Sequence, residues 1–488
     1  MMSRIRSFRL MTMIAIGSAC ACAAAEREVL VSVMNWNSPI GGIVDGSQRW
    51  GLSNYAYLRQ TNGSIDMNYP LSSGVSLPDE VVYASDEFYR LQREGAKHDL
   101  SLMKAGGFDA VMYDGSPTAQ FDSTHPLSPS NQPFIGYLVF REWLIAATAS
   151  GMKVGFSPDI GWKTTAASWI ERLSFILNDS GSHPSQYRID GKTVIMHFGT
   201  SYSMKAPPVP GDPKPDEGWR KVTGALREKG HSFYFAADIR PSDANIADWH
   251  LTADAVYLFA PAGPRTYFPD VHPLMASRMS NTLPIIWSVS PGYYNPRLRS
   301  YTEPDFERIH LTYLAAMSNN AERLIVLTWN DFAEDTDIVP SANKGSSLYD
   351  VFTFYNKWFK SGVMPKPLRD RVIIAMPKTI PRAVKSKASK WGGGNLFWPN
   401  SDYAPKVFYW AVVAKPRRLS VGGKTVDLPA GLSFGECGSV QAGAQHAELD
   451  GKTISLPPVG DADTEGTEEK GLFLGYGLHF RYFDLAAR

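Results

Sequence analysis

The chain has 488 residues, of which 44% are hydrophobic and 20% charged, and its formal net charge is +1. This length and composition exclude a disordered chain and allow a large core, divided among two or three domains or built as one barrel with a smaller module. The balanced charge contains no basic block that would follow phosphates, so nucleic acid is not an expected partner.

Residues 1–25 have the pattern of a secretory signal peptide. A basic start is followed by a short apolar run from Leu10 to Ile16 and by three consecutive alanines at the cleavage site. The mature protein is therefore expected to begin near Glu26 and to be secreted or periplasmic. No later stretch approaches twenty uninterrupted apolar residues, so no membrane span is expected.

Three cysteines occur in the whole chain, and two of them, Cys20 and Cys22, belong to the expected signal. Their removal would leave Cys437 alone, which excludes a disulfide within the mature chain. A lipid anchor on Cys20 or Cys22 is the alternative left open. No subunit partner is indicated, and a monomer is favoured.

From the mature start to about residue 365, apolar runs typical of strands alternate with helical or polar stretches. The expected strands cover 29–36, 108–113, 152–156, 193–198, 232–237, 253–259, 283–288 and 324–328. The expected helices cover 85–105, 134–149, 218–229, 305–317 and 347–359. Eight strands alternating with helical connections predict an α/β fold, a (β/α)8 TIM barrel, over residues 26–365.

A second domain is expected over residues 366–488, because prolines become frequent there and helical periodicity ends. Strands separated by Gly and Pro turns are expected at 407–414, 419–428, 452–456 and 472–483. This pattern favours a small C-terminal β-sandwich that accompanies the barrel.

Acids and aromatic rings follow the expected barrel strands. Asp331 and Glu334 come after the last strand, three residues apart, and directly behind Trp329 and Asn330. The other rim candidates are Trp36, Asp114, Asp159, Trp162, Asp238 and Tyr293. Since barrels of this type carry their catalytic side chains at the carboxyl ends of the strands, these residues predict a site for an uncharged, polyhydroxylated ligand. For any one of these acids taken singly, a helix cap or a turn is the favoured interpretation, but five of them in register favour a site.

Two carboxylates at slightly different depths can divide proton donation and proton acceptance between them. A solvated acidic turn and a calcium loop are the alternatives for this stretch. The calcium loop is disfavoured, because no glycine follows Asp335 and Asp337 at the required place and no terminal Glu closes a twelve-residue loop.

The sequence motifs that would indicate other kinds of active site are weaker or absent. Gly431, Ser433 and Gly435 match the spacing of a nucleophile elbow, but no helix is expected after them, and a β-turn is favoured. No HExxH or paired-cysteine motif, dinucleotide-binding glycine loop or Walker sequence occurs. Neither a metal nor an organic cofactor is therefore expected.

The segment from Trp329 to Asp335, WNDFAED, resembles the WNDYGES signature of glycoside hydrolase family 71, the α-1,3-glucanases or mutanases. Further likeness covers residues 99–114, 187–199, 287–294 and the run from 370 onward. The resemblance implies endo-acting, inverting hydrolysis of α-1,3-glucan, with Asp331 and Glu334 as the catalytic pair. It also implies that Trp287, Tyr293, Trp329 and Asn330 lie at the substrate.

Within this pair we expect Glu334 to be the acid and Asp331 the base, because nearby negative charge raises the pKa of one carboxyl. The sequence leaves the reverse assignment open.

Four positions depart from the family pattern. Phe332 replaces Tyr, Ala333 replaces Gly, Asp335 replaces Ser, and Gly292 replaces a Trp that would be a sugar platform. Loss of a stacking ring reshapes a sugar subsite. Another α-linked polysaccharide, as in the mannan-active family 99, and a glycan-binding barrel without turnover are therefore the alternatives.

Overall fold

The structure is a computed structural model. It describes residues 26–34, 86–115, 132–159, 165–200, 215–241, 243, 246–259, 267–279, 282–295, 300–302, 304–331, 334–340, 344–366, 368–377, 406–440, 442–459 and 480–487. The expected signal peptide, Trp36, Trp162, Phe332 and Ala333 lie outside these residues.

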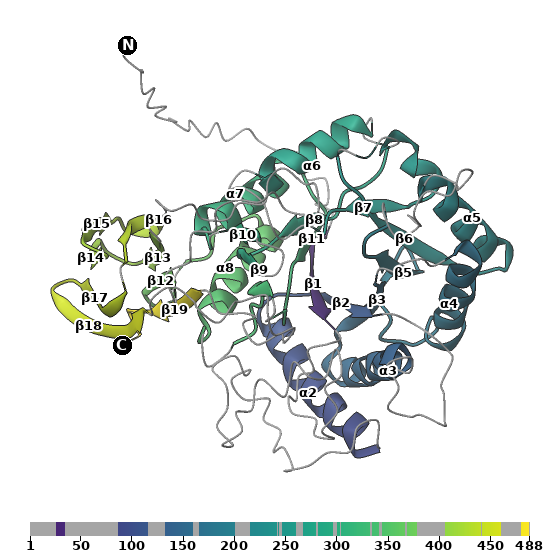
Figure 1. The fold of residues 1–488 in the computed structure, drawn as a ribbon, viewed down its shortest axis with the longest axis horizontal. Coiled ribbons are helices and arrows are strands. Elements are labelled where there is room, and N and C mark those ends of the chain that lie inside the picture. Colours follow the sequence, from purple (N-terminus) through teal and green to yellow (C-terminus); the bar gives the residue numbers. More distant parts are fainter. Residues whose placement is uncertain are drawn as a thin grey trace, which may run out of the picture.

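In the described part of the chain, eight parallel strands form a barrel, and Figure 1 looks along its axis. The strands are β1 (Glu28–Met34), β2 (Ala110–Gly115), β3 (Lys153–Pro158), β5 (Lys192–His197), β6 (Phe233–Asp238), β7 (Ala255–Tyr257), β8 (Trp287–Val289) and β11 (Arg323–Val326). They pair in chain order from β1 to β7, and β11 pairs with both β8 and β1. A parallel bridge between Val256 and Ile285 closes the remaining gap. The predicted (β/α)8 barrel is therefore confirmed.

Alternating side chains of the strands enter two different cores. On β1, Leu30 joins a cluster inside the barrel, whereas Val29, Val31 and Val33 join the larger cluster beneath the helices. Because both faces of a parallel barrel are covered, its strands are continuous apolar runs. These runs made it possible to predict the strands from the sequence.

Helices surround the barrel (Figure 1). They are α2 (Asp86–Ala105), α3 (Gln132–Ser150), α4 (Ala166–Asp179), α5 (Pro215–Glu228), the 3-10 helix η2 (Ile246–Leu251), α6 (Tyr267–Arg278), α7 (Phe306–Ser318) and α8 (Ser347–Ser361). Asp305 caps α7 by accepting the Glu307 N–H, and Gly362, at φ +68°, ends α8 in the left-handed region. The sequence did not predict α4 or α6. Pro273 inside α6 interrupts the helical pattern there.

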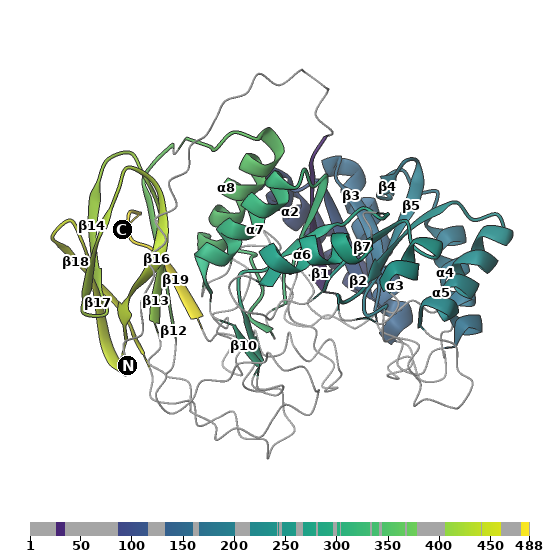
Figure 2. The same ribbon diagram turned by 90° about the horizontal axis from the view of Figure 1, so that it is seen from above.

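The C-terminal part is a β-sandwich of two antiparallel sheets within the described residues. One sheet contains β12 (Arg371–Pro377), β13 (Lys406–Val413), β16 (Gly431–Ser439) and β19 (Phe480–Asp484). The other contains β14 (Arg417–Val421), β15 (Lys424–Leu428), β17 (Gly443–Leu449) and β18 (Lys452–Val459). Figure 2 shows the sandwich beside α7 and α8. The predicted sandwich is confirmed, although β12, β16 and β17 were not expected.

Two local expectations in the sandwich were wrong. The single strand expected over 419–428 is a hairpin that turns at Gly422 and Gly423, both of which have positive φ. The expected β-turn at Gly431 to Gly435 is part of β16, where Ser433 lies opposite Ala411. A serine in the middle of a strand has none of the strand–turn–helix geometry of a nucleophile elbow.

Candidate active site

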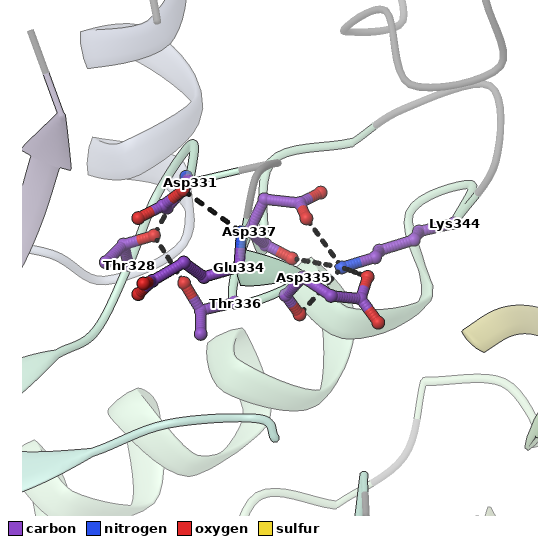
Figure 3. Close-up of polar contacts among 7 residues, drawn as sticks. All are labelled: Thr328, Asp331, Glu334, Asp335, Thr336, Asp337 and Lys344. Carbon is purple, nitrogen blue, oxygen red and sulfur yellow. Dashed lines mark hydrogen bonds and ion pairs between the residues drawn. The ribbon is translucent and has the colours of Figure 1, made fainter. Parts of the chain in front are cut away.

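The described residues that follow β11, 327–331 and 334–340, form an acidic loop at the carboxyl ends of the barrel strands. The Asp331 N–H donates to Thr328 Oγ1 (2.9 Å), and the Thr336 N–H donates to the Asp331 carbonyl (3.2 Å). The hydroxyls of Thr328 and Thr336 lie 3.0 Å apart. These bonds, drawn in part in Figure 3, fold the loop back on itself and fix the backbone on both sides of Glu334.

Asp331 and Glu334 lie close together but at different depths. The Glu334 N–H donates to Asp331 Oδ1 (3.2 Å), and Glu334 Oε1 accepts a bond from the Tyr293 hydroxyl (2.7 Å). Asp331 is 1% exposed, whereas Glu334 is partly exposed. Tyr293 reaches Glu334 from β9 (Tyr293–Asn295), which pairs with β10 (Ser300–Thr302) after β8. One residue of the pair is therefore buried and the other is partly exposed.

A third carboxyl, that of Asp114, lies at the end of β2 and is fully buried. Burial raises its pKa well above the ordinary value, and the charges of Asp159 and Asp331 raise it further. Among the described residues, neither carboxyl oxygen of Asp114 has a hydrogen-bond partner. Burial and these two charges therefore favour the protonated form of Asp114 over the ionised one.

Two predicted substrate-binding residues, Trp287 and Trp329, lie in the hydrophobic core. Trp287 is 4% exposed and stacks on His272 of α6, with 4.6 Å between the ring centroids. Trp329 is fully buried, and its Nε1–H donates to Asp99 Oδ2 of α2 (3.0 Å). Both rings point from the barrel toward the helices and belong to the hydrophobic core, and that they contact substrate stays a prediction. Alternation along the strand explains the placement of Trp287, since its neighbour Ile286 takes the inward position.

Two predicted ligand-binding residues, Asp238 and Asn330, form hydrogen bonds with backbone groups. Asp238 accepts the N–H groups of Gly199 (2.9 Å) and Phe259 (2.8 Å), which joins the ends of three strands. Asn330 accepts the Met34 N–H (2.8 Å) and donates to the Met34 carbonyl (3.1 Å). Both side chains hold the rim of the barrel together.

Gly292 lies where the family pattern has a tryptophan. A Cβ at this position would lie 3.1 Å from both Thr302 O and Pro304 Cα, closer than ordinary van der Waals contact. Thr302 and Pro304 therefore occupy the space that a side chain at 292 would need.

The sequence did not predict Lys344 as part of the site. Its ammonium group is buried behind the acidic loop and contacts Asp335 and Asp337 (Figure 3). Nothing in the local sequence, Asn-Lys-Gly, indicates a buried cation, since lysine is normally exposed.

Within the described ranges, no three His, Cys, Asp or Glu side chains gather in a way that could hold a metal ion. None of the described helices combines the length and the apolar character needed to cross a bilayer.

No protein-family model and no curated protein matches the chain. Among solved structures, it is similar to the GH99 endo-α-mannosidase from Bacteroides thetaiotaomicron, with a TM-score of 0.48 and 16% identity over 69% of this chain and 98% of the mannosidase. It is also similar to an endo-β-1,4-mannanase from Thermotoga petrophila, with a TM-score of 0.37 and 9% identity over 75% of this chain and 94% of that one. Likenesses this remote carry no activity over to the chain, whose function has to be argued from its own side chains.

Proposed function

We propose that the protein is an exported glycoside hydrolase that cleaves an α-linked glucan, α-1,3-glucan first among them, with Asp331 and Glu334 as its catalytic pair. The observation that carries the proposal is a pair of acidic residues, one buried and one partly exposed, at the carboxyl ends of the barrel strands. The Glu334 N–H donates to Asp331 Oδ1 and joins the two residues. Active sites of (β/α)8 barrels lie at the carboxyl ends of the strands, and two carboxyl groups suffice to hydrolyse a glycosidic bond.

In the proposed reaction, Glu334 gives its proton to the glycosidic oxygen while Asp331 takes a proton from the attacking water. Water attacks the anomeric carbon on the face opposite the leaving group, the bond from that carbon to the glycosidic oxygen breaks, and the product has the inverted configuration. The next cycle begins once the proton on Asp331 has returned to Glu334 through solvent. Internal cleavage of the chain is part of the proposal.

Two further carboxyls would bind sugar hydroxyls. In its protonated form, which burial favours, Asp114 would donate a hydrogen bond, and Asp159, which follows β3, would accept one. The reshaped surroundings of Gly292 support a subsite that differs from the tryptophan platform of the family, so the linkage preference belongs to the test.

The test is product analysis on a panel of insoluble and soluble α-glucans that includes α-1,3-glucan, together with α-mannan. New reducing ends from α-1,3-glucan are expected, as oligosaccharides before any monosaccharide accumulates, and NMR should show the β-anomer first. Net retention would contradict the inverting scheme. Cleavage of α-mannan alone would reject the glucan assignment, and binding on a glycan array without cleavage of any substrate would reject the enzyme.

A further inference from the structure

The acidic loop is held from behind by one buried cation, Lys344. Its Nζ donates to the carbonyl oxygens of Asp335 (3.2 Å) and Asp337 (3.0 Å) and to Asp337 Oδ1 (2.7 Å), and it lies 2.9 Å from Asp335 Oδ1. The lysine side chain is 1% exposed. Four oxygen contacts from two loop residues converge on this single ammonium group, as Figure 3 shows.

These contacts act on the backbone next to Glu334. Asp335 follows Glu334 directly and has φ +54°, a left-handed conformation that a non-glycine residue adopts at a cost. Since Lys344 binds the carbonyls of residues 335 and 337, it holds the turn whose first residue adjoins Glu334. On the opposite side, Thr336 forms hydrogen bonds with Thr328 and Asp331. The turn is therefore held both by the ammonium group and by the residues that follow β11.

The sandwich covers this cation. The ring of Tyr482, from β19, lies with its centroid 5.7 Å from Lys344 Nζ, within the range of a cation–π interaction. Tyr482 is 4% exposed and also packs edge-on against Phe306 of α7, at 6.3 Å between centroids. Tyr482 thus contacts both Lys344 and helix α7.

We propose that Lys344 is a positioning residue for Glu334, and that the sandwich takes part in catalysis by holding Lys344 in place through the ring of Tyr482. This inference rests on the proposed function and assigns a role to the domain that supplies Tyr482. Lys344 acts only through the loop, so it should govern turnover and leave substrate binding unchanged.

The first experiment compares Lys344→Met with the triple variant Lys344→Met, Asp335→Asn, Asp337→Asn. The single variant leaves two buried carboxylates without their cation and should destabilise the fold. The triple variant removes all three charges, and asparagine tolerates the left-handed conformation at position 335. Its midpoint of thermal unfolding should therefore return toward that of the parent.

On α-1,3-glucan, kcat of the triple variant should nevertheless stay about 100-fold below that of the parent, with KM little changed, because a displacement of about 1 Å at a catalytic group costs on that order. A structural role alone would restore kcat together with stability. Parent-like kcat in the triple variant would therefore overturn the proposal.

The second experiment tests the sandwich with a matched pair at Tyr482. Tyr482→Leu removes the ring from Lys344 and should lower kcat several-fold at unchanged KM. Tyr482→Phe keeps the ring and should leave both constants at parent values. Equal kcat for the Leu variant and the parent would overturn the role of the sandwich.

A readout without substrate separates this inference from the proposed function. Amide hydrogen exchange in a peptide covering residues 331–337 should be slow in the parent and at least about ten-fold faster in the triple variant, since the loop opens locally when its tether is lost. Unchanged exchange overturns the tether even in an enzyme that cleaves glucan. Faster exchange supports it even if no α-glucan is cleaved.

Discussion

At the scale of single residues, the site separates three carboxyls by their surroundings. Asp114 is buried without a hydrogen-bond partner among the described residues, and burial raises its pKa. Asp331 is buried but accepts the Glu334 N–H, and Glu334 is accessible and bonded to Tyr293. Different environments can assign different protonation states to chemically similar groups, which acid–base catalysis requires.

The Tyr293 hydroxyl gives a direct test of the role of Glu334. Its hydrogen bond stabilises the ionised carboxylate, so Tyr293→Phe should raise the pKa of Glu334. If Glu334 is the acid, the basic limb of the kcat/KM profile moves up by roughly 0.5–1 pH unit, equivalent to a hydrogen bond of about 1 kcal/mol.

Tyr349→Phe removes a hydroxyl that donates to the Leu102 carbonyl in the helix layer, and it should leave both limbs in place. A shift confined to the acidic limb in Tyr293→Phe would reverse the assignment and make Glu334 the base.

At the scale of elements, the ends of the barrel strands are tied together by polar side chains whose partners are backbone groups. Asp238 binds the segments that follow β5 and β7, and Asn330 binds the end of β1. Trp329 adds a bond from the acidic loop to α2 through Asp99. These bonds fix the rim on which the candidate catalytic residues lie.

The pH dependence of stability should reveal Asp238. Burial raises its pKa from 3.8 to about 7, so between these values the folded state binds a proton that the unfolded state releases. Asp238 therefore contributes up to about 4 kcal/mol to the free energy of unfolding. This contribution is fully present below pH 3.8 and is lost as the pH rises through 7.

The free energy of unfolding of Asp238→Asn, measured by denaturant titration from pH 4 to pH 8, should fall less steeply with pH than that of the parent. Identical slopes would show that Asp238 is not protonated on folding.

The sequence predicted the barrel because each strand is buried on both faces and appears as an apolar run, as at Leu324 to Thr328. It could not assign individual side chains to the mouth of the barrel. Trp287 and Trp329 lie in correct segments, but alternation along a strand and packing on helices decide which way a ring points. Lys344 escaped prediction for a related reason, because its carboxylate partners reach it only after the loop has folded.

At the scale of the whole molecule, barrel and sandwich share one hydrophobic core. Ile373, Phe408, Trp410 and Tyr482 of the sandwich belong to the same buried cluster as the barrel helices. The Trp410 ring meets Phe354 of α8 edge-on at 5.4 Å between centroids. Two parts joined in this way should unfold together.

Loss of a ring at this interface should separate the two parts. Trp410→Ala is expected to lower the free energy of unfolding by about 3–5 kcal/mol. In calorimetry, the single transition of the parent should become two in this variant. Leu449→Ala, in the outer sheet, truncates the separate core of the sandwich and should lower the midpoint while keeping one transition. Two transitions in the parent would contradict the shared core.

The central claim is that Asp331 and Glu334 perform hydrolysis, and its most direct test is the turnover of α-1,3-glucan by Asp331→Asn, Glu334→Gln and Glu322→Gln. Glu322 immediately precedes β11 at the opposite end of that strand from the acidic loop, and its side chain is 54% exposed, so it controls for the loss of a carboxylate. We predict that kcat falls by about 10²–10⁴-fold in each of the first two variants and stays at the parent value in the third. Equal turnover by the parent and all three variants would contradict the assignment of the pair.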